Sequence, residues 1–283
     1  MKAAAFDYVR ATSVAHALDV LAERGDDVRL LAGGQSLVPA LNLRLSAPGL
    51  LLDIGGLEEL RGITIRDGVL RLGALVRHVE LENSPLIAEH APLLAQAAVH
   101  IAHAAIRNRG TIGGSLANAD PAAELPACVL ALGARIVVTG QGGTIRRIAA
   151  EDFFQGVYAT ALHPDEILTG VEIDARPGGQ SAFGEFVRRR GDYALVGLAM
   201  QARMEGGTLR DSRLAWFGVG DRPVLSPATA AALAGRRPDT ASVALAQEKL
   251  SAELDPRGDI HAAAGTRLQL ARVLLARALA TLH

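Results

Sequence analysis

The chain has 283 residues, enough for two domains or one large α/β domain, and its 49% hydrophobic content excludes a disordered or fibrous protein. Its 29 basic and 30 acidic side chains nearly cancel, so no overall field favours nucleic acid or an anionic membrane. The single cysteine, Cys128, excludes a disulfide framework and any zinc or iron–sulfur site held by cysteines of this chain alone. Redox chemistry would therefore need an organic cofactor.

Lysine is rare in this sequence. Lys2 and Lys249 are the only two, and neither lies in a Gly-rich phosphate loop or an apolar run. Near the N-terminus, Asp7 and Arg10 interrupt the apolar segment that a signal peptide needs, which predicts a cytoplasmic protein. The longest stretch without Asp, Glu, Lys or Arg, residues 90–106, contains three histidines and predicts a buried helix rather than a membrane span.

The first elements of the chain alternate between helix and strand. Residues 13–24 have helical periodicity, with Ser13 as the expected N-cap and Gly25 as the stop. Short β-type runs follow at 28–32 and 50–54, and the first of them ends in a glycine pair. The pattern predicts small strands linked by short helices.

The next segment predicts a hairpin followed by helices. Residues 63–66 and 69–73 flank Asp67-Gly68, a dipeptide that favours a type I′ turn. Residues 77–106 are expected to be mainly helical, and 124–132 form a further predicted helix. This half of the chain is therefore expected to be α+β.

A second predicted hairpin and a strong turn signal close the first half. The hairpin pairs 135–139 with 144–148, and a strand is expected over 167–173. The cluster Arg176-Pro177-Gly178-Gly179-Gln180 carries the strongest turn signal in the sequence. We place a domain boundary there, which gives domains of residues 1–176 and 177–283.

The second domain is expected to be an antiparallel sheet backed by helices. Strand-like runs occupy 181–190, 194–204 and 209–219, and helices are expected over 240–254 and 263–282. The fold class predicted for the whole chain is α+β.

Two glycine pairs are candidate ligand-binding loops: Ala32-Gly33-Gly34-Gln35-Ser36 and Thr111-Ile112-Gly113-Gly114-Ser115. Paired glycines allow positive φ and a close approach to a ligand, with successive N–H groups directed at a phosphate. Hydroxyls in both segments add donors, so two such loops facing each other would hold a pyrophosphate without a lysine. For each pair the alternative is an ordinary tight turn. Neither fits GxGxxG, so a dinucleotide would require a fold other than the Rossmann fold.

Polar residues follow the second glycine pair. Asn118, Asp120 and Glu124 lie just beyond it, and carboxylates suit ribose hydroxyls. The alternative is that Asp120 and Glu124 cap and charge the N-terminus of the next helix, and the residues alone leave both open. His100 and His103 have no evident third ligand, so no metal site is predicted.

Four segments together resemble a known family. They are LAGGQSLVPALNLRL at 31–45, IRNRGTIGGSLANADPAAELPA at 106–127, RRRGDYALVGLA at 188–199 and GDIHAAAGTRLQLARVLLARAL at 258–279. In order and spacing they look like the FAD-binding medium subunit of bacterial molybdenum hydroxylases. That group includes the xanthine dehydrogenase and aerobic carbon monoxide dehydrogenase types.

The resemblance implies a fold and a set of FAD contacts. The fold is the two-part FAD-binding domain of the vanillyl-alcohol oxidase and murB type, followed by the C-terminal domain of the carbon monoxide dehydrogenase flavoprotein. By analogy Asn118, Asp120 and Glu124 lie near the ribose and ribityl side, Leu168 near the adenine and Tyr193 near the isoalloxazine ring. The pyrophosphate would be cradled by two runs, namely Leu31, Ala32, Gly33, Gly34, Gln35, Ser36 and Leu37, and Thr111, Ile112, Gly113, Gly114 and Ser115.

The resemblance also implies a function. The chain would be a flavoprotein and an oxidoreductase component, the electron-transfer subunit of a heteromeric molybdenum hydroxylase. Its partners would be a small [2Fe-2S] subunit and a large molybdopterin subunit, arranged as a dimer of heterotrimers. Because the chain would position the flavin rather than supply acid–base groups, no catalytic residue is predicted.

Two departures and two alternatives qualify this expectation. Carbon monoxide dehydrogenase relatives often have histidine where Gln35 stands, which weakens a carbon monoxide assignment, and glutamine is common where Ala105 stands. One alternative is a self-sufficient flavin oxidase with its own substrate base. The other is a flavin-free scaffold subunit. The substrate and the electron acceptor cannot be identified from this sequence.

Overall fold

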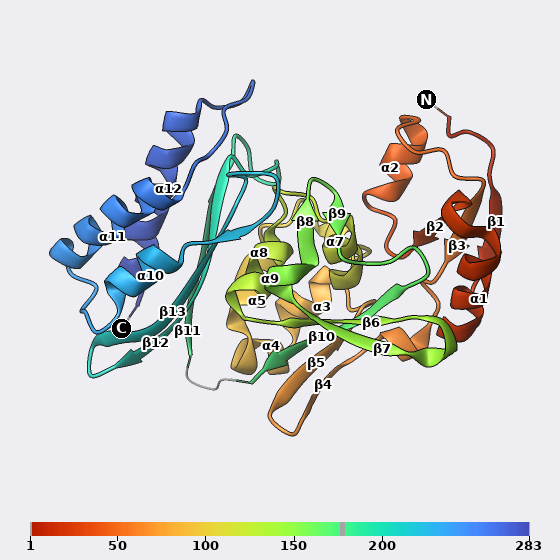
Figure 1. Ribbon diagram of the computed structural model, residues 1–283, viewed down its shortest axis with the longest axis horizontal. Helices are drawn as coiled ribbons and strands as arrows, with labels where there is room; N and C mark the ends of the chain where they lie inside the picture. The colour runs from red at the N-terminus through yellow and green to blue at the C-terminus, as the bar shows by residue number, and fades with distance from the viewer. Residues whose placement is uncertain (1, 176–178, 283) are drawn as a thin grey trace.

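The computed structural model describes residues 2–175 and 179–282, and over them the chain forms three sheets with flanking helices (Figure 1). A short two-stranded ribbon, β8 (Phe154–Gly156) and β9 (Ala159–Thr160), lies outside those sheets. The predicted α+β class is confirmed. The predicted boundary between Arg176 and Pro177 lies outside the described residues. No helix in the described residues is both long and apolar enough to cross a membrane.

The N-terminal sheet is parallel, with strand order β1-β3-β2. Its strands are β1 (Asp7–Arg10), β2 (Val28–Leu31) and β3 (Leu50–Asp53). Helix α1 (Val14–Arg24) covers it and begins and ends as predicted, because the Ser13 hydroxyl accepts from the His16 amide at 3.0 Å and Gly25 follows with φ 57°. The turn η1 (Gly25–Asp27) leads into β2, and α2 (Leu37–Asn42) follows it.

The middle sheet is antiparallel, with strand order β4-β5-β10-β6-β7. Its strands are β4 (Ile63–Arg66), β5 (Val69–Gly73), β6 (Arg135–Thr139), β7 (Ile145–Ala149) and β10 (Ile167–Asp174). Both predicted hairpins are confirmed, and Asp67 and Gly68 have the positive φ of a type I′ turn. The short turns η2 (Glu58–Leu60) and η3 (Gln141–Gly143) adjoin this sheet.

Helices cover one face of the middle sheet. They are α3 (His78–Asn83), α4 (Pro85–His90), α5 (Pro92–Ala98), α6 (Ala104–Arg107), α7 (Ile112–Asn118), α8 (Glu124–Ala131) and α9 (Ala150–Phe153). The single buried helix expected over 90–106 is wrong. Pro92 starts a new helix at its N1 position, and the chain turns between α5 and α6.

The C-terminal domain is the expected antiparallel sheet backed by helices. The strands, in spatial order, are β11 (Gln180–Phe186), β12 (Val196–Glu205), β13 (Thr208–Phe217) and β14 (Val224–Leu225). Three helices pack on one face: α10 (Pro227–Leu233), α11 (Thr240–Glu253) and α12 (Ala264–Ala280). The first strand stops at Phe186, four residues before the predicted end.

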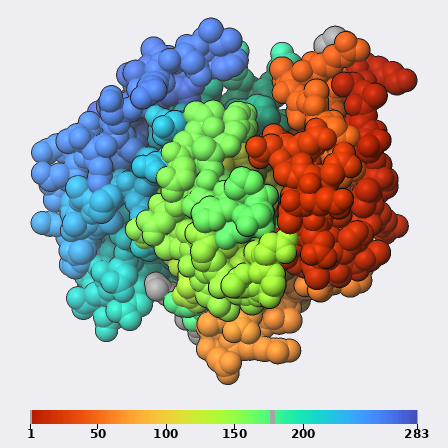
Figure 2. Space-filling view, turned by 45° about the vertical axis from the view of Figure 1, so that its right-hand side comes forward, coloured from red at the N-terminus to blue at the C-terminus, as the bar shows by residue number. Residues whose placement is uncertain are grey.

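One hydrophobic core runs through the middle of the molecule. Helices α5 and α8 lie between the middle sheet and the C-terminal sheet, and their side chains share a cluster with Ala199, Ala215 and Phe217 (Figure 1). The N-terminal sheet packs its own cluster, and its surface meets the middle of the chain along one side (Figure 2). The Gln141 side chain donates to the Leu18 carbonyl at 2.6 Å across that side.

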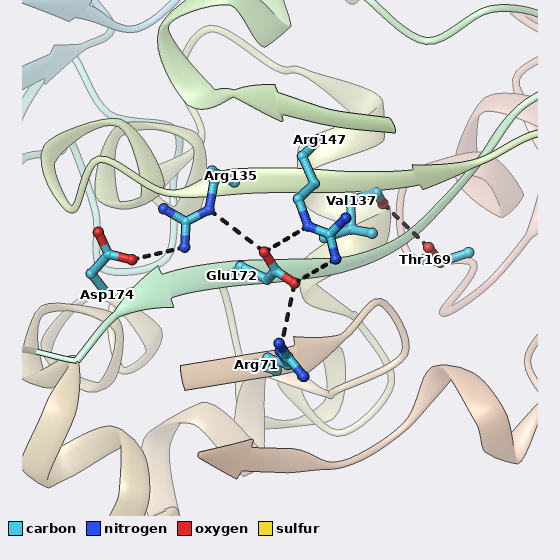
Figure 3. A network of polar contacts seen from close by, with 7 residues as sticks. All are labelled: Arg71, Arg135, Val137, Arg147, Thr169, Glu172 and Asp174. Carbon is cyan, nitrogen blue, oxygen red and sulfur yellow. Dashed lines mark hydrogen bonds and ion pairs between the residues drawn. The ribbon is translucent and has the colours of Figure 1, made fainter. Parts of the chain in front are cut away.

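The middle sheet also carries an ion network on its other face. Glu172 on β10 lies opposite Arg71 on β5 and Arg135 on β6 (Figure 3). Arg147 on β7 donates to both Glu172 carboxylate oxygens, at 3.0 and 3.2 Å. The Glu172 side chain is only 9% exposed, and Arg135 also binds Asp174 at 2.7 Å. The arginines, above all Arg147, hold the pKa of Glu172 below its usual range.

Candidate functional site: two glycine segments and an acidic, aromatic end

The first glycine pair forms a turn between β2 and α2. The carbonyl of Leu31 accepts from the Ile54 amide at 3.0 Å, which fixes the end of β2. Gly34 has φ +73°, and the Gln35 side chain donates to the Gly33 carbonyl at 3.1 Å. In the part of the chain that the structure describes, the backbone N–H groups of Gly34, Gln35 and Ser36 donate to no protein atom. They remain available to an anion.

The second glycine pair is the first turn of α7 rather than a loop. Thr111 is the N-cap, and its hydroxyl accepts from the Gly114 amide at 3.1 Å. The Gly113 amide donates to the Ala74 carbonyl at 2.9 Å, so the expectation that its N–H groups all face a ligand is wrong. Glycine is needed there for close packing, since a Cβ on Gly113 would lie 2.6 Å from the Ala74 Cβ.

The two glycine segments touch, as the pyrophosphate hypothesis requires. A Cβ on Gly33 would lie 2.2 Å from the Arg109 carbonyl oxygen and 2.9 Å from the Gly110 Cα. A Cβ on Gly114 would lie 3.9 Å from the Ala32 Cβ. Segments almost 80 residues apart in sequence therefore meet backbone to backbone, at a spacing that only glycine permits at Gly33.

Acidic and aromatic side chains gather at the other end of α7. The Asp120 carboxylate accepts from the Ala122 amide at 2.9 Å and from the Tyr158 hydroxyl at 3.2 Å. Tyr193 is 74% exposed, and its pKa is raised by burial of the hydroxyl and by the charges of Asp120 and Glu124. The structure thus brings together residues of the first domain and the predicted isoalloxazine contact of the second.

Tyr158 belongs to this group and was missed by the sequence analysis. Its amide donates to the Ala119 carbonyl at 3.3 Å, and both residues have positive φ. Burial and the neighbouring Asp120 carboxylate raise the pKa of Tyr158 to about 12. In the sequence, Tyr158 is only an aromatic residue shortly after Gly156, and no periodic pattern indicates a role for it.

Glu124 is the first residue of α8, the position that the helix-start alternative predicts, but the N-cap is Ala123 and Asp120 does not cap this helix. Burial, together with the charges of Glu185 and Asp120, raises the pKa of Glu124 to about 8. Asn118 ends α7 and is half-buried. Leu168, by contrast, is only 5% exposed and packs in the core, so its side chain is not brought to the other candidate residues.

Arg267 fixes the segment that carries Tyr193. Its guanidinium donates to the Leu195 carbonyl, to the Gly218 carbonyl at 2.7 Å and to Asp259 at 2.6 Å. The Gly218 amide in turn donates to the Pro121 carbonyl at 2.9 Å. The C-terminal domain is thereby tied to the residues between Asp120 and Glu124.

His78 supports the second glycine segment from behind. Its ring is buried, and a Cβ on Gly110 would lie 2.8 Å from it. Among the described residues neither ring nitrogen has a hydrogen-bond partner by geometry. Burial lowers the pKa of His78 to about 4, so the ring is neutral at physiological pH.

This pKa predicts a loss of stability in acid. Between pH 6.5 and about pH 4 the unfolded chain binds a proton at His78 that the folded chain does not, so the free energy of unfolding falls by about 3 kcal/mol. We expect urea unfolding of a His78→Gln variant to lack this part of the pH dependence. His163→Gln, at an exposed histidine, serves as the control. An unchanged acid loss in His78→Gln would contradict the prediction.

A cavity of ≈ 440 Å³ lies elsewhere, between α1, η3 and the residues around Leu60 and Thr169. None of the predicted FAD contacts lines it. The candidate site is therefore the pair of glycine segments and the acidic, aromatic end of α7, not this cavity.

Comparison with known proteins assigns the family. Residues 4–175 match the FAD binding domain in molybdopterin dehydrogenase, and residues 181–282 match the CO dehydrogenase flavoprotein C-terminal domain. The chain belongs to the FAD-binding medium subunits of the molybdenum hydroxylase family. This FAD subunit is thus an oxidoreductase component, as the sequence predicted.

Individual relatives match over almost the full length. The 6-hydroxypseudooxynicotine dehydrogenase complex subunit alpha of Paenarthrobacter nicotinovorans is 40% identical, with 99% of this chain and 95% of the relative covered. A solved carbon monoxide dehydrogenase from Hydrogenophaga pseudoflava is 34% identical, with TM-score 0.95 and coverage of 99% and 98%. Quinoline 2-oxidoreductase from Pseudomonas putida 86 is 38% identical, with TM-score 0.94 and coverage of 99% and 97%.

The site of this FAD subunit fits its cofactor. A pyrophosphate needs closely approaching backbone and donors that are not used within the protein. The contact between Gly33 and Arg109 supplies the first, and the unpaired N–H groups of Gly34, Gln35 and Ser36 supply the second. The exposed Tyr193 offers an aromatic face at the far end of α7.

Proposed function

We propose that this chain is the FAD-carrying electron-transfer subunit of a heteromeric molybdenum hydroxylase. In this proposal a large molybdopterin subunit oxidises the substrate, and [2Fe-2S] clusters of a small subunit carry the electrons to the flavin site of this chain. An external acceptor such as NAD, a quinone or oxygen removes them. When bound, FAD supplies the exchange between one-electron and two-electron carriers. The observation that carries the proposal is the contact between the two glycine segments at Gly33 and Arg109.

The residues present divide the work of holding FAD. The segment from Leu31 to Leu37 offers N–H donors to the pyrophosphate, and the turn at Arg109 and Gly110, just before Thr111, packs against it. Helix α7, with seven residues, spans about 10 Å and separates this end from Asp120 and Tyr193. Those residues would lie beside the ribityl chain and the ring.

An apolar surface beside the site supports the heteromeric assembly. Val38, Leu43 and Leu45, on and after α2, are 42%, 54% and 79% exposed. Three exposed apolar side chains within eight residues are consistent with a contact to another protein. The relatives are named as a medium chain or a complex subunit, which also favours partners here. We propose a cytoplasmic dimer of heterotrimers.

Co-expression with the neighbouring genes tests the proposal. We expect this chain to copurify with an iron–sulfur protein and a molybdopterin protein, and to carry one FAD. Substrate added to the complex should bleach the flavin absorbance, whereas the same substrate should leave the isolated yellow chain unchanged. Bleaching of the isolated chain by an alcohol or amine would instead indicate a self-sufficient oxidase. A colourless chain would indicate a scaffold.

A further inference from the structure

Three consecutive arginines, Arg188, Arg189 and Arg190, follow β11 and lie exposed. In the part of the chain that the structure describes, no carboxylate forms an ion pair with any of these three side chains. Asp192 is exposed in the same turn, so the turn carries three positive charges and one negative charge. Other arginines of this sheet do bind carboxylates, at 2.6 to 3.4 Å: Arg203, Arg210 and Arg213. The turn therefore offers positive charge to a group outside this chain.

The backbone of this turn is held in place. The Asp192 amide donates to the Arg189 carbonyl at 3.0 Å. Gly191 has φ +86°, and a Cβ there would lie 3.0 Å from the Ala102 carbonyl oxygen. The turn thus packs backbone to backbone on the connection between α5 and α6, which fixes where the arginines leave the surface.

Ile260 protrudes from a second turn beside the arginines and is 93% exposed. The Asp259 carboxylate holds this turn, because it accepts from the His261 amide at 2.8 Å. The buried Arg267 donates to Asp259 at 2.6 Å and also to the Leu195 carbonyl, so one guanidinium joins the two turns. An apolar side chain on a turn that is already ordered loses little backbone entropy when it docks.

The two turns form one surface beside the flavin end of the site. The ring nitrogen Nδ1 of His261 lies 3.5 Å from Nη1 of Arg188. Tyr193, the proposed contact of the flavin ring, follows the arginines by three residues and is 74% exposed. We define the arginine surface by five residues: Arg188, Arg189, Arg190, Ile260 and His261.

The chemistry of the arginine surface indicates what docks on it. Small-molecule sites are concave, whereas Ile260 protrudes, and the cavities of ≈ 440 and ≈ 390 Å³ are lined by other side chains. Arginine is enriched in contacts between proteins. Permanent interfaces are large and mainly apolar, but brief electron-transfer contacts are small and are steered by charge. A charged surface with a single exposed aliphatic side chain fits the second kind.

We propose that the arginine surface docks an acidic one-electron carrier protein, which takes electrons from the flavin. The inference rests on the proposed function and names the external acceptor that it leaves open. Each carrier takes one electron, so two carriers collect the two electrons of one reduced flavin, and its two protons pass to solvent. The apolar surface of Val38, Leu43 and Leu45 remains for the permanent subunits.

Binding of cytochrome b5, an acidic one-electron carrier, to the immobilised copurified complex tests the surface without turnover. At low salt we expect the Arg189→Gln/Arg190→Gln variant to bind it at least about tenfold more slowly than the wild type. The difference should vanish at high salt, where the charges are screened. Ile260→Ser should raise the dissociation rate severalfold at either salt concentration, because an apolar contact is not screened. The basic cytochrome c should not bind.

Arg236→Gln/Arg237→Gln is the matched control, because it removes the same charge from another exposed pair of arginines. The Arg236 carbonyl accepts from the Leu209 amide at 2.8 Å. Leu209 pairs with Met204, near the end of β12 that is farthest from Tyr193. This variant should bind cytochrome b5 at the wild-type rate, and both double variants should keep the wild-type flavin content.

Electron transfer supplies a second readout. The complex, reduced with a limiting amount of dithionite, is mixed with oxidised cytochrome b5 or with a small uncharged quinone. We expect Arg189→Gln/Arg190→Gln to reduce cytochrome b5 at least about tenfold more slowly than the wild type and the quinone at the wild-type rate.

Three outcomes would overturn the docking proposal and leave the proposed function intact. The first is equal binding of cytochrome b5 by both double variants, and the second is wild-type binding of cytochrome b5 no stronger than that of cytochrome c. The third is loss of the iron–sulfur subunit from Arg189→Gln/Arg190→Gln, since the surface would then hold a permanent subunit. A wild-type complex without FAD would instead overturn the proposed function.

Discussion

The Gly33→Ala variant is expected to lose most of its FAD while keeping its fold. The added methyl group would lie 2.2 Å from the Arg109 carbonyl oxygen, which belongs to backbone and cannot rotate away. Overpacking costs about 1–3 kcal/mol. Because the two glycine segments must move apart to relieve the clash, we expect this cost to appear as a loss of FAD-binding free energy. FAD affinity should therefore fall roughly 10- to 100-fold. Flavin content per chain and a fluorescence titration measure it.

Gly265→Ala is the matched control for this experiment. Gly265 lies within α12, and a Cβ there meets nothing within 4 Å. Gly265 is the second residue of α12, so alanine there should leave both the fold and FAD binding unchanged. Equal flavin content in Gly33→Ala and Gly265→Ala would show that the contact between the glycine segments does not hold the pyrophosphate.

Among the variants proposed here, Glu172→Gln should show the largest decrease in the free energy of unfolding at neutral pH. It would leave Arg71, Arg135 and Arg147 close together around a neutral side chain that is 9% exposed in the wild type (Figure 3). Removing a carboxylate that accepts charged hydrogen bonds costs about 1.5–3 kcal/mol, and the 33–48% exposure of the three arginines places this variant toward the lower end through solvent screening. Urea unfolding at neutral pH measures the difference.

An exposed ion pair provides the comparison. Glu205 binds Arg210 at 2.9 Å, but its side chain is 67% exposed. Glu205→Gln should lower the free energy of unfolding by less than about 1 kcal/mol. If Glu172→Gln and Glu205→Gln unfold at the same urea concentration, the Glu172 network contributes no more to the free energy of unfolding than an exposed ion pair does.

Local sequence signals predicted local structure well. Ser13 and Gly25 marked both ends of α1, and Asp67-Gly68 marked the first hairpin, because capping and turn formation involve neighbouring residues. Strand β1 was missed, since its pairing with β3 joins segments about 40 residues apart and its side chains do not alternate in burial. Helix α7 was missed because two glycines lower its helix propensity, while packing against Ala74 and the Thr111 cap stabilise it.

Only part of the candidate site could be predicted, because local sequence patterns do not report contacts between distant residues. The glycine pairs are visible in the sequence, but only the folded chain shows that the amides of the first are unpaired and those of the second are used within the protein. The groups formed by Tyr158 with Asp120, and by Arg188 with His261, join residues 38 and 73 positions apart. No spacing rule reports such contacts.

Gly218 has a consequence for how the molecule is assembled. It accepts a hydrogen bond from Arg267 of the C-terminal domain and donates one to Pro121, three residues before Glu124. The two domains therefore meet in a direct backbone hydrogen bond beside the proposed FAD site, in addition to the hydrophobic core that they share. The position of Tyr193 relative to Asp120 and Glu124 thus depends on how the C-terminal domain is seated, and not on the first domain alone.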